Sequence, residues 1–103
     1  MIYKGMRAIH PGEILLEEFM KPPINANTLP KALEVPANRI TAIIKGQRGI
    51  TGDTAVRLAA FFNTTAEFWM NLQKTYELRL AEQAVPVRVR KHIEQRREAL
   101  ATA

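Results

Sequence analysis

The stretch from Leu29 to Gly46 constrains the fold more than any other part of the chain, because its apolar residues follow the spacing of two short helices that cross at a steep angle. Every position that a helix-turn-helix frame from Ala26 to Lys45 turns inward is apolar: Leu29, Leu33, Val35, Ile40 and Ile43. The second helix of such a unit is free to enter a DNA groove, so the spacing predicts DNA binding. The same unit also occurs in domains that bind only protein.

Small and polar side chains occupy the outer side of the expected second helix, residues 36–45. Asn38 carries the groups for a bidentate contact with the edge of adenine. Ala37 and the methyl group of Thr41 suit the methyl group of thymine. The alternative is that such residues are ordinary solvated members of a first helical turn.

Cationic side chains follow on the same helix and just after it. Arg39, on the flank, could reach a guanine or a phosphate, whereas Lys45 and Arg48 are better suited to phosphates, which position a protein without reading sequence. The predicted DNA-binding residues are therefore Pro36, Ala37, Asn38, Arg39, Thr41, Lys45 and Arg48.

Two residues depart from the usual pattern of this motif. Pro30 would cost about 3 kcal/mol inside a helix, so we expect the first helix to start late, with Asn27 as its cap and Pro30 in its first turn. Glu34 stands at the tight turn, where a positive φ favours glycine, and we expect it to be strained or to change the turn. Both departures weaken the case for DNA binding more than the case for the fold.

No segment alternates apolar and polar residues in the manner of a strand, so the predicted fold class is all-α. The expected helices span residues 10–20, 25–34, 36–45, 51–62 and 64–83, and the apolar residues of the fourth place it in the core. The tail could add a sixth helix over about residues 87–100, although its apolar stripe is thin. We expect residues 1–83 to form a helix-turn-helix DNA-binding and dimerisation domain and residues 84–103 a basic C-terminal extension.

The expected fifth helix begins with Thr64 and Glu67 in a capping-box pattern, and apolar side chains follow at helical spacing. Such a stripe is often core. Because a bundle of about 100 residues has little inner surface, we expect part of it to form a homodimer interface: Phe68, Trp69, Leu72 and Tyr76. A two-fold axis would place the two DNA-reading helices one DNA turn apart, about 34 Å.

Composition limits the other functions. The chain has 103 residues, which suits one domain, and its net charge of +5 favours a polyanionic partner. It has no cysteine and no apolar run near the roughly 20 residues that span a bilayer, and its N-terminus does not resemble a signal peptide. We therefore expect a cytoplasmic protein that binds no membrane.

An enzyme is not expected. The two histidines, His10 and His92, lie far apart in the chain, and the pair Glu17 and Glu18 suits a solvated helix face better than acid–base catalysis. No glycine-rich phosphate loop, metalloprotease motif or nucleophile motif is present. We expect no catalytic residues, no metal and no cofactor.

The segments on either side of the helix-turn-helix unit make the pattern more specific. HPGEILLEEF, residues 10–19, precedes the unit, and KGQRGITGDTAVRLAAFFNTTAEFWMNLQKTYEL, residues 45–78, follows it. Over roughly residues 6–83 the chain resembles the HigA-type antitoxins, a branch of the phage-repressor-like (Xre-type) helix-turn-helix superfamily.

This resemblance implies a five-helix fold and a homodimer that binds its own double-stranded DNA operator and represses its own operon. It also implies neutralisation of a cognate toxin protein, typically a ribosome-dependent ribonuclease. The recognition helix maps to residues 36–45, the phosphate-contacting turn to residues 45–48 and the dimer-forming helix to residues 68–80.

The alternative is a folded protein-interaction module, a toxin inhibitor or dimerisation domain, whose DNA binding has been weakened or lost through Pro30 and Glu34. The tail beyond Pro86 lies outside the resemblance. It could add phosphate contacts, dock a partner or be a solvated terminus.

Overall fold

The computed structural model describes residues 7–102, and that part of the chain contains helices and turns but no strand. The elements are α1 (Pro11–Ile14), the π-helical continuation η1 (Leu15–Phe19), α2 (Thr28–Leu33), α3 (Ala37–Ile44), α4 (Gly52–Phe62), α5 (Ala66–Ala84) and α6 (Val87–Ala101). The all-α prediction is confirmed, including the sixth helix.

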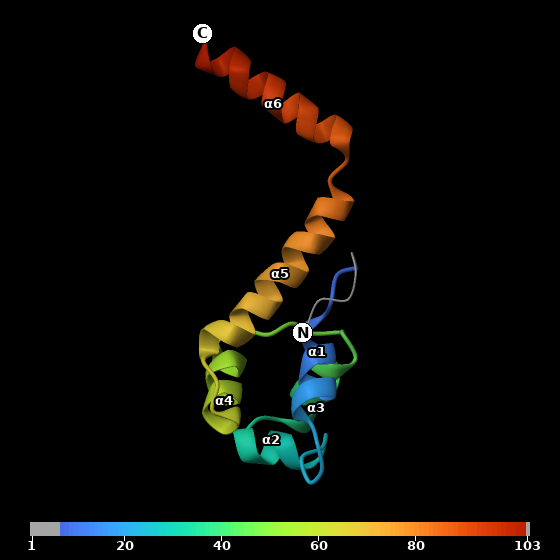
Figure 1. The fold of residues 1–103 in the computed structure, drawn as a ribbon, viewed down its shortest axis with the longest axis vertical. Helices are drawn as coiled ribbons and strands as arrows, with labels where there is room; N and C mark the ends of the chain where they lie inside the picture. The colour runs from blue at the N-terminus through green and yellow to red at the C-terminus, as the bar shows by residue number, and fades with distance from the viewer. Residues whose placement is uncertain (1–6, 103) are drawn as a thin grey trace.

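Helices α1 to α4 and the first half of α5 form a bundle (Figure 1). Helix α1 contacts α3 and α5, α2 contacts α3 and α4, and α4 packs along α5. Four of the five inward residues of the helix-turn-helix frame are buried, and Val35 packs against the same core. The apolar spacing therefore identified the centre of the fold correctly.

Helix α1 begins where the sequence predicted. The side chain of His10 accepts a hydrogen bond from the Gly12 N–H (2.9 Å), and the Glu13 carboxylate accepts one from the His10 N–H (3.1 Å). Pro11 occupies the first turn, where its missing N–H has no partner to lose.

Helix α2 starts late, as expected, at Thr28, and Pro30 is buried in its first turn. Asn27 stands at the cap position, but its side chain makes no capping hydrogen bond. Asn25 does so instead: its Oδ1 accepts hydrogen bonds from the N–H groups of Asn27 (2.8 Å) and Thr28 (2.9 Å). The proline thus causes a short helix rather than a broken one.

Glu34 keeps the tight turn rather than changing it. Its backbone is left-handed, with φ 58° and ψ 48°. Arg57, on α4, donates hydrogen bonds from Nη1 to the carbonyl oxygens of Leu33 (2.8 Å) and Glu34 (3.3 Å). These contacts hold the turn in a conformation that a glutamate adopts only at a cost.

The junction between α4 and α5 partly differs from the prediction. Asn63 ends α4 in the left-handed conformation, with φ 57°. The cap of α5 is Thr65, whose Oγ1 accepts a hydrogen bond from the Phe68 N–H (3.1 Å), rather than Thr64. Thr64 accepts the hydrogen bond of the buried Trp69 indole N–H (2.8 Å), because that donor needs a partner inside the core.

Helix α4 is less buried than its composition predicted. Ala55 and Leu58 belong to the core, but the side chains of Val56 and Phe61 are 61% and 41% exposed. Because α4 packs on α5 along one face, its opposite face is exposed to solvent, and that face also carries apolar side chains.

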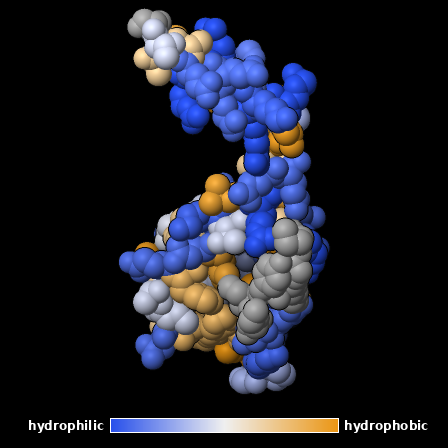
Figure 2. Space-filling model, turned by 45° about the horizontal axis from the view of Figure 1, so that its top comes forward, coloured by the Kyte–Doolittle hydropathy of each residue, from blue (hydrophilic) through white to orange (hydrophobic). Residues whose placement is uncertain are grey.

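The end of α5 and the whole of α6 project from the bundle (Figure 1). The radius of gyration is 17.9 Å, against about 13 Å for a compact chain of this length. Helix α6 has no buried residue, and Figure 2 shows it as mostly hydrophilic. Among the described helices, none combines the length and apolar character needed to cross a membrane.

Candidate nucleic-acid interface

The N-terminal end of α3 forms an exposed edge of the bundle. Pro36, Ala37 and Asn38 are exposed, and Thr41 is half-buried one turn further on. The Asn38 side chain makes no hydrogen bond to any described residue, so its amide is available to a ligand. The Thr41 hydroxyl donates to the Ala37 carbonyl oxygen (2.9 Å), which leaves its methyl group for an outside contact.

A basic turn follows α3 directly; we use this name for residues 45–50. Gly46 has φ 74°, the left-handed conformation that ends a helix. Lys45 and Arg48 are exposed, and neither forms an ion pair with a described residue. Two free cations beside an exposed helix suit the phosphates of a DNA strand.

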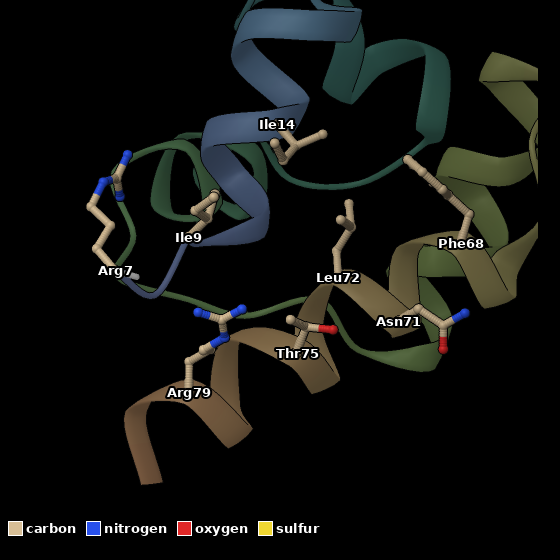
Figure 3. A pocket seen from close by; sticks show the side chains of 8 residues that line it. All are labelled: Arg7, Ile9, Ile14, Phe68, Asn71, Leu72, Thr75 and Arg79. Atoms are coloured by element: carbon tan, nitrogen blue, oxygen red, sulfur yellow. The ribbon is translucent and has the colours of Figure 1, made fainter. Parts of the chain in front are cut away.

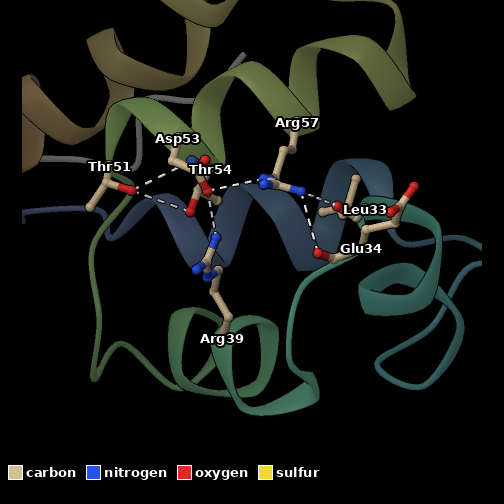
Figure 4. Close-up of polar contacts among 7 residues, drawn as sticks. All are labelled: Leu33, Glu34, Arg39, Thr51, Asp53, Thr54 and Arg57. Atoms are coloured by element: carbon tan, nitrogen blue, oxygen red, sulfur yellow. Dashed lines mark hydrogen bonds and ion pairs between the residues drawn. The ribbon is translucent and has the colours of Figure 1, made fainter.

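Arg39 behaves differently from the rest of the predicted set, because it is engaged inside the molecule (Figure 4). Its Nη1 lies 2.6 Å from Oδ2 of Asp53, and its side chain is only 22% exposed. Arg57 donates from Nε to the same Asp53 oxygen (3.0 Å). The pKa of the Asp53 carboxyl lies below its ordinary value because of the hydrogen bonds from Arg57 and then Arg39. In this structure Arg39 connects α3 to α4 instead of facing outward.

The aromatic stripe of α5 divides into core and surface. Trp69 is fully buried among Phe19, Phe62 and Phe68, so in this structure its side chain belongs to the core and offers no surface to a partner. The physical reason is that helical spacing alone does not tell which part of a stripe the bundle covers. Leu72 is 8% exposed, and Phe68 and Tyr76 are half-buried.

An apolar pocket of about 220 Å³ lies beside Phe68 and Leu72 (Figure 3). Ile9 and Ile14 complete its apolar lining from the N-terminal side, and polar groups surround them: Arg7, Asn71, Thr75 and Arg79. Arg7 is paired with Glu13 (2.6 Å). Sequence reasoning missed Ile9 and Asn71 as surface residues of this site, because only the packing of α1 on α5 brings them together.

A helical bundle that presents one short helix on a tight turn, with free cations directly after it, defines a helix-turn-helix DNA-binding protein. No model of a protein family matches the chain. Virulence-associated protein I of Dichelobacter nodosus is 53% identical over 79 residues, which cover 76% of this chain and 73% of that protein. Antitoxin HigA-1 of Vibrio cholerae is 36% identical over 73 residues, covering 70% of this chain and 69% of the antitoxin.

Solved structures agree with these relatives. PA4674 of Pseudomonas aeruginosa, in complex with its operator DNA, superposes with a TM-score of 0.76 and 47% identity over 89% of this chain and 94% of that one. An addiction module antidote protein of the HigA family from Coxiella burnetii has a TM-score of 0.74 and 51% identity over 86% of this chain and 94% of that one. The chain belongs to the HigA family of helix-turn-helix antitoxins.

Proposed function

We propose that this protein is the antitoxin of a toxin–antitoxin module that acts in the cytoplasm. As a homodimer it binds the double-stranded DNA operator of its own operon, represses transcription there, and neutralises a cognate ribonuclease toxin. The observation that carries the DNA-binding part is the exposed end of α3, where Asn38 and the two cations of the basic turn have no partner among the described residues.

The two unusual residues of the motif do not oppose this function. Pro30 lies in the first turn of α2, and Glu34 adopts the left-handed conformation that the turn requires. The turn between α2 and α3 therefore has the left-handed residue that the motif requires at this position. This supports DNA binding over the alternative of an interaction module that has lost it.

We propose that residues 1–83 form the DNA-binding and dimerisation domain and that residues 84–103 are a basic extension. Phe68, Leu72 and Tyr76 face the dimer partner, with the pocket beside α5 as part of the contact. A two-fold axis here repeats the same patch on both subunits and sets the spacing of the two α3 helices.

The test is equilibrium binding of the full chain to the DNA upstream of its own gene, by fluorescence anisotropy at several salt concentrations. We expect specific affinity at least about 1,000-fold tighter than for random DNA of equal length. Equal affinity for both DNAs at moderate salt would favour the interaction module. Light scattering measures the dimer, and co-expression with the neighbouring reading frame tests relief of toxicity.

A further inference from the structure

Two side chains from other helices support the basic turn, and the predicted DNA-binding residues include neither of them. Gln73 reaches the turn from α5, and His10 reaches it from the start of α1. Both contact the backbone of the turn and leave the charged side chains of Lys45 and Arg48 exposed.

Gln73 forms the stronger anchor. Its Oε1 accepts a hydrogen bond from the Ile50 N–H at 2.7 Å, across a chain separation of 23 residues. Its Nε2 donates to Oε2 of Glu77 (2.9 Å), which orients the amide so that its oxygen faces the turn. Gly49 lies against the same amide, since a Cβ there would come within 2.7 Å of the Gln73 amide atoms. The hydrogen bond and this close contact therefore fix the end of the turn in one position on α5.

His10 supports the other end. Its Nδ1 accepts a hydrogen bond from the Gly12 N–H (2.9 Å). The backbone of Arg48 lies close enough to the ring to raise the pKa of His10, against the larger lowering by burial. A Cβ on Gly46 would lie 3.9 Å from the ring, in ordinary contact with it. On its other side the ring meets Tyr76 of α5 edge-on, with centroids 4.8 Å apart.

Phosphate contacts fix the register of a protein on DNA, and they require their cations at set positions. Lys45 and Arg48 have long side chains that form no ion pair with a described residue, so the backbone beneath them decides where their charges can reach. That backbone is exposed to solvent at residues 45–48 and gains its outside support from His10 and Gln73.

We propose that Gln73 and His10 are positioning residues for operator binding: they touch no DNA, but hold the basic turn so that Lys45 and Arg48 meet the phosphates together. The proposal rests on the proposed operator binding. It also gives the glutamine of the α5 segment a role that neither core packing nor dimerisation requires.

The main test uses Gln73→Met, which keeps the length of the side chain and removes the acceptor. We expect operator affinity to fall about 10-fold, the size of one lost hydrogen-bond contribution, and the salt slope to decrease by about 1, as for one lost phosphate contact. Gln95→Met makes the same chemical change at an exposed position of α6 and should bind as the wild type does.

A double-mutant cycle that combines Gln73→Met with Arg48→Ala separates positioning of the basic turn from a general loss of stability. If Gln73 acts through the turn, Arg48→Ala should lose less affinity in the Gln73→Met protein than in the wild type. Fully additive losses, or an unchanged affinity and salt slope in Gln73→Met, would overturn the proposal.

A second set of variants tests the proposal if the Gln73→Met protein does not fold. Gln73→Glu keeps an oxygen for the Ile50 N–H but places a carboxylate beside Glu77, and adding Glu77→Gln restores a donor to it. We expect the single variant to bind weakly and the pair to return to within about threefold of wild type. A pair as weak as the single variant contradicts the proposal.

His10→Asn tests the second anchor, because asparagine also caps a helix but is too short to reach the turn. We expect weaker operator binding with a reduced salt slope, and wild-type binding would remove His10 from the proposal. Failure of the wild type itself to bind its operator would instead refute the proposed function, so the two failures are distinct.

Discussion

Gly12 lies directly against the backbone carbonyl of Ile43, so closely that a Cβ at residue 12 would overlap the carbonyl oxygen. Helix α1 therefore crosses the recognition helix α3 backbone to backbone. The position of α3 on the bundle depends on the absence of a side chain at this point.

The first prediction concerns this crossing. Gly12→Ala should lower the free energy of unfolding by about 1–3 kcal/mol, because the two helices must move apart to admit the methyl group. Urea denaturation measures the loss. Gly52→Ala is the matched control: nothing lies within 4 Å of a Cβ there, so stability should be unchanged or slightly higher. Equal stability of the wild type and Gly12→Ala would show that the crossing is not tight.

Base reading by α3 rests on Asn38. Asn38→Ala should weaken operator binding by about 1–3 kcal/mol and leave binding to random DNA nearly intact. Lys45→Ala should weaken both and flatten the salt dependence, since it removes a phosphate contact. Anisotropy titrations with the two DNAs separate these effects. An equal loss on both DNAs for Asn38→Ala would mean that Asn38 does not read bases.

The left-handed turn stores strain at Glu34. Glu34→Gly should raise the free energy of unfolding by about 0.5–1 kcal/mol, because glycine adopts φ 58° without a steric penalty and this gain exceeds the added entropy of the unfolded chain. Glu34→Ala is the control that removes the charge and keeps the strain. If alanine stabilises as much as glycine, the effect comes from the charge and not from the backbone.

Stability should depend on pH through His10. Burial holds the pKa of His10 below its ordinary value of 6.5, against the opposing effects of Glu13 and the Arg48 backbone. The unfolded chain therefore takes up a proton first as the pH falls. The contribution of His10 is complete above about pH 6.5 and decreases below it, as the pH approaches the lower folded value.

Thermal melts from about pH 8 to about pH 5 measure this dependence. His10→Asn should show a flatter profile than the wild type. His92→Asn, on exposed α6, should leave the profile as it is in the wild type. A profile unaffected by His10→Asn would mean that the proton is taken up elsewhere.

The tail should be separable from the bundle. Helix α6 has no buried residue, so truncation after Gln83 should leave the thermal midpoint within about 2 °C while helical circular dichroism falls. If the tail adds no phosphate contacts, the salt slope of operator binding also stays the same. A large drop in midpoint would show that the tail covers part of the domain.

Much of this architecture is local in origin and was therefore predictable. The late start of α2 follows from Pro30, the cap of α1 from the HPGE sequence, and the end of α4 from Asn63, since each depends on neighbouring residues. The inward residues of the helix-turn-helix unit were predictable for the same reason. The exposed end of α3, with Asn38 and the basic turn, lies where the motif predicted it.

Other features depended on residues far along the chain. The sequence did not determine where the side chains of Arg39 and Trp69 point. Asp53 on α4 holds Arg39, and three phenylalanines surround the indole of Trp69. Nothing in the sequence around Gln73 indicates that its side chain bonds to a turn 23 residues earlier in the chain. Periodicity states which face of a helix is apolar; only packing states which distant element covers that face, because contact depends on how the helices cross.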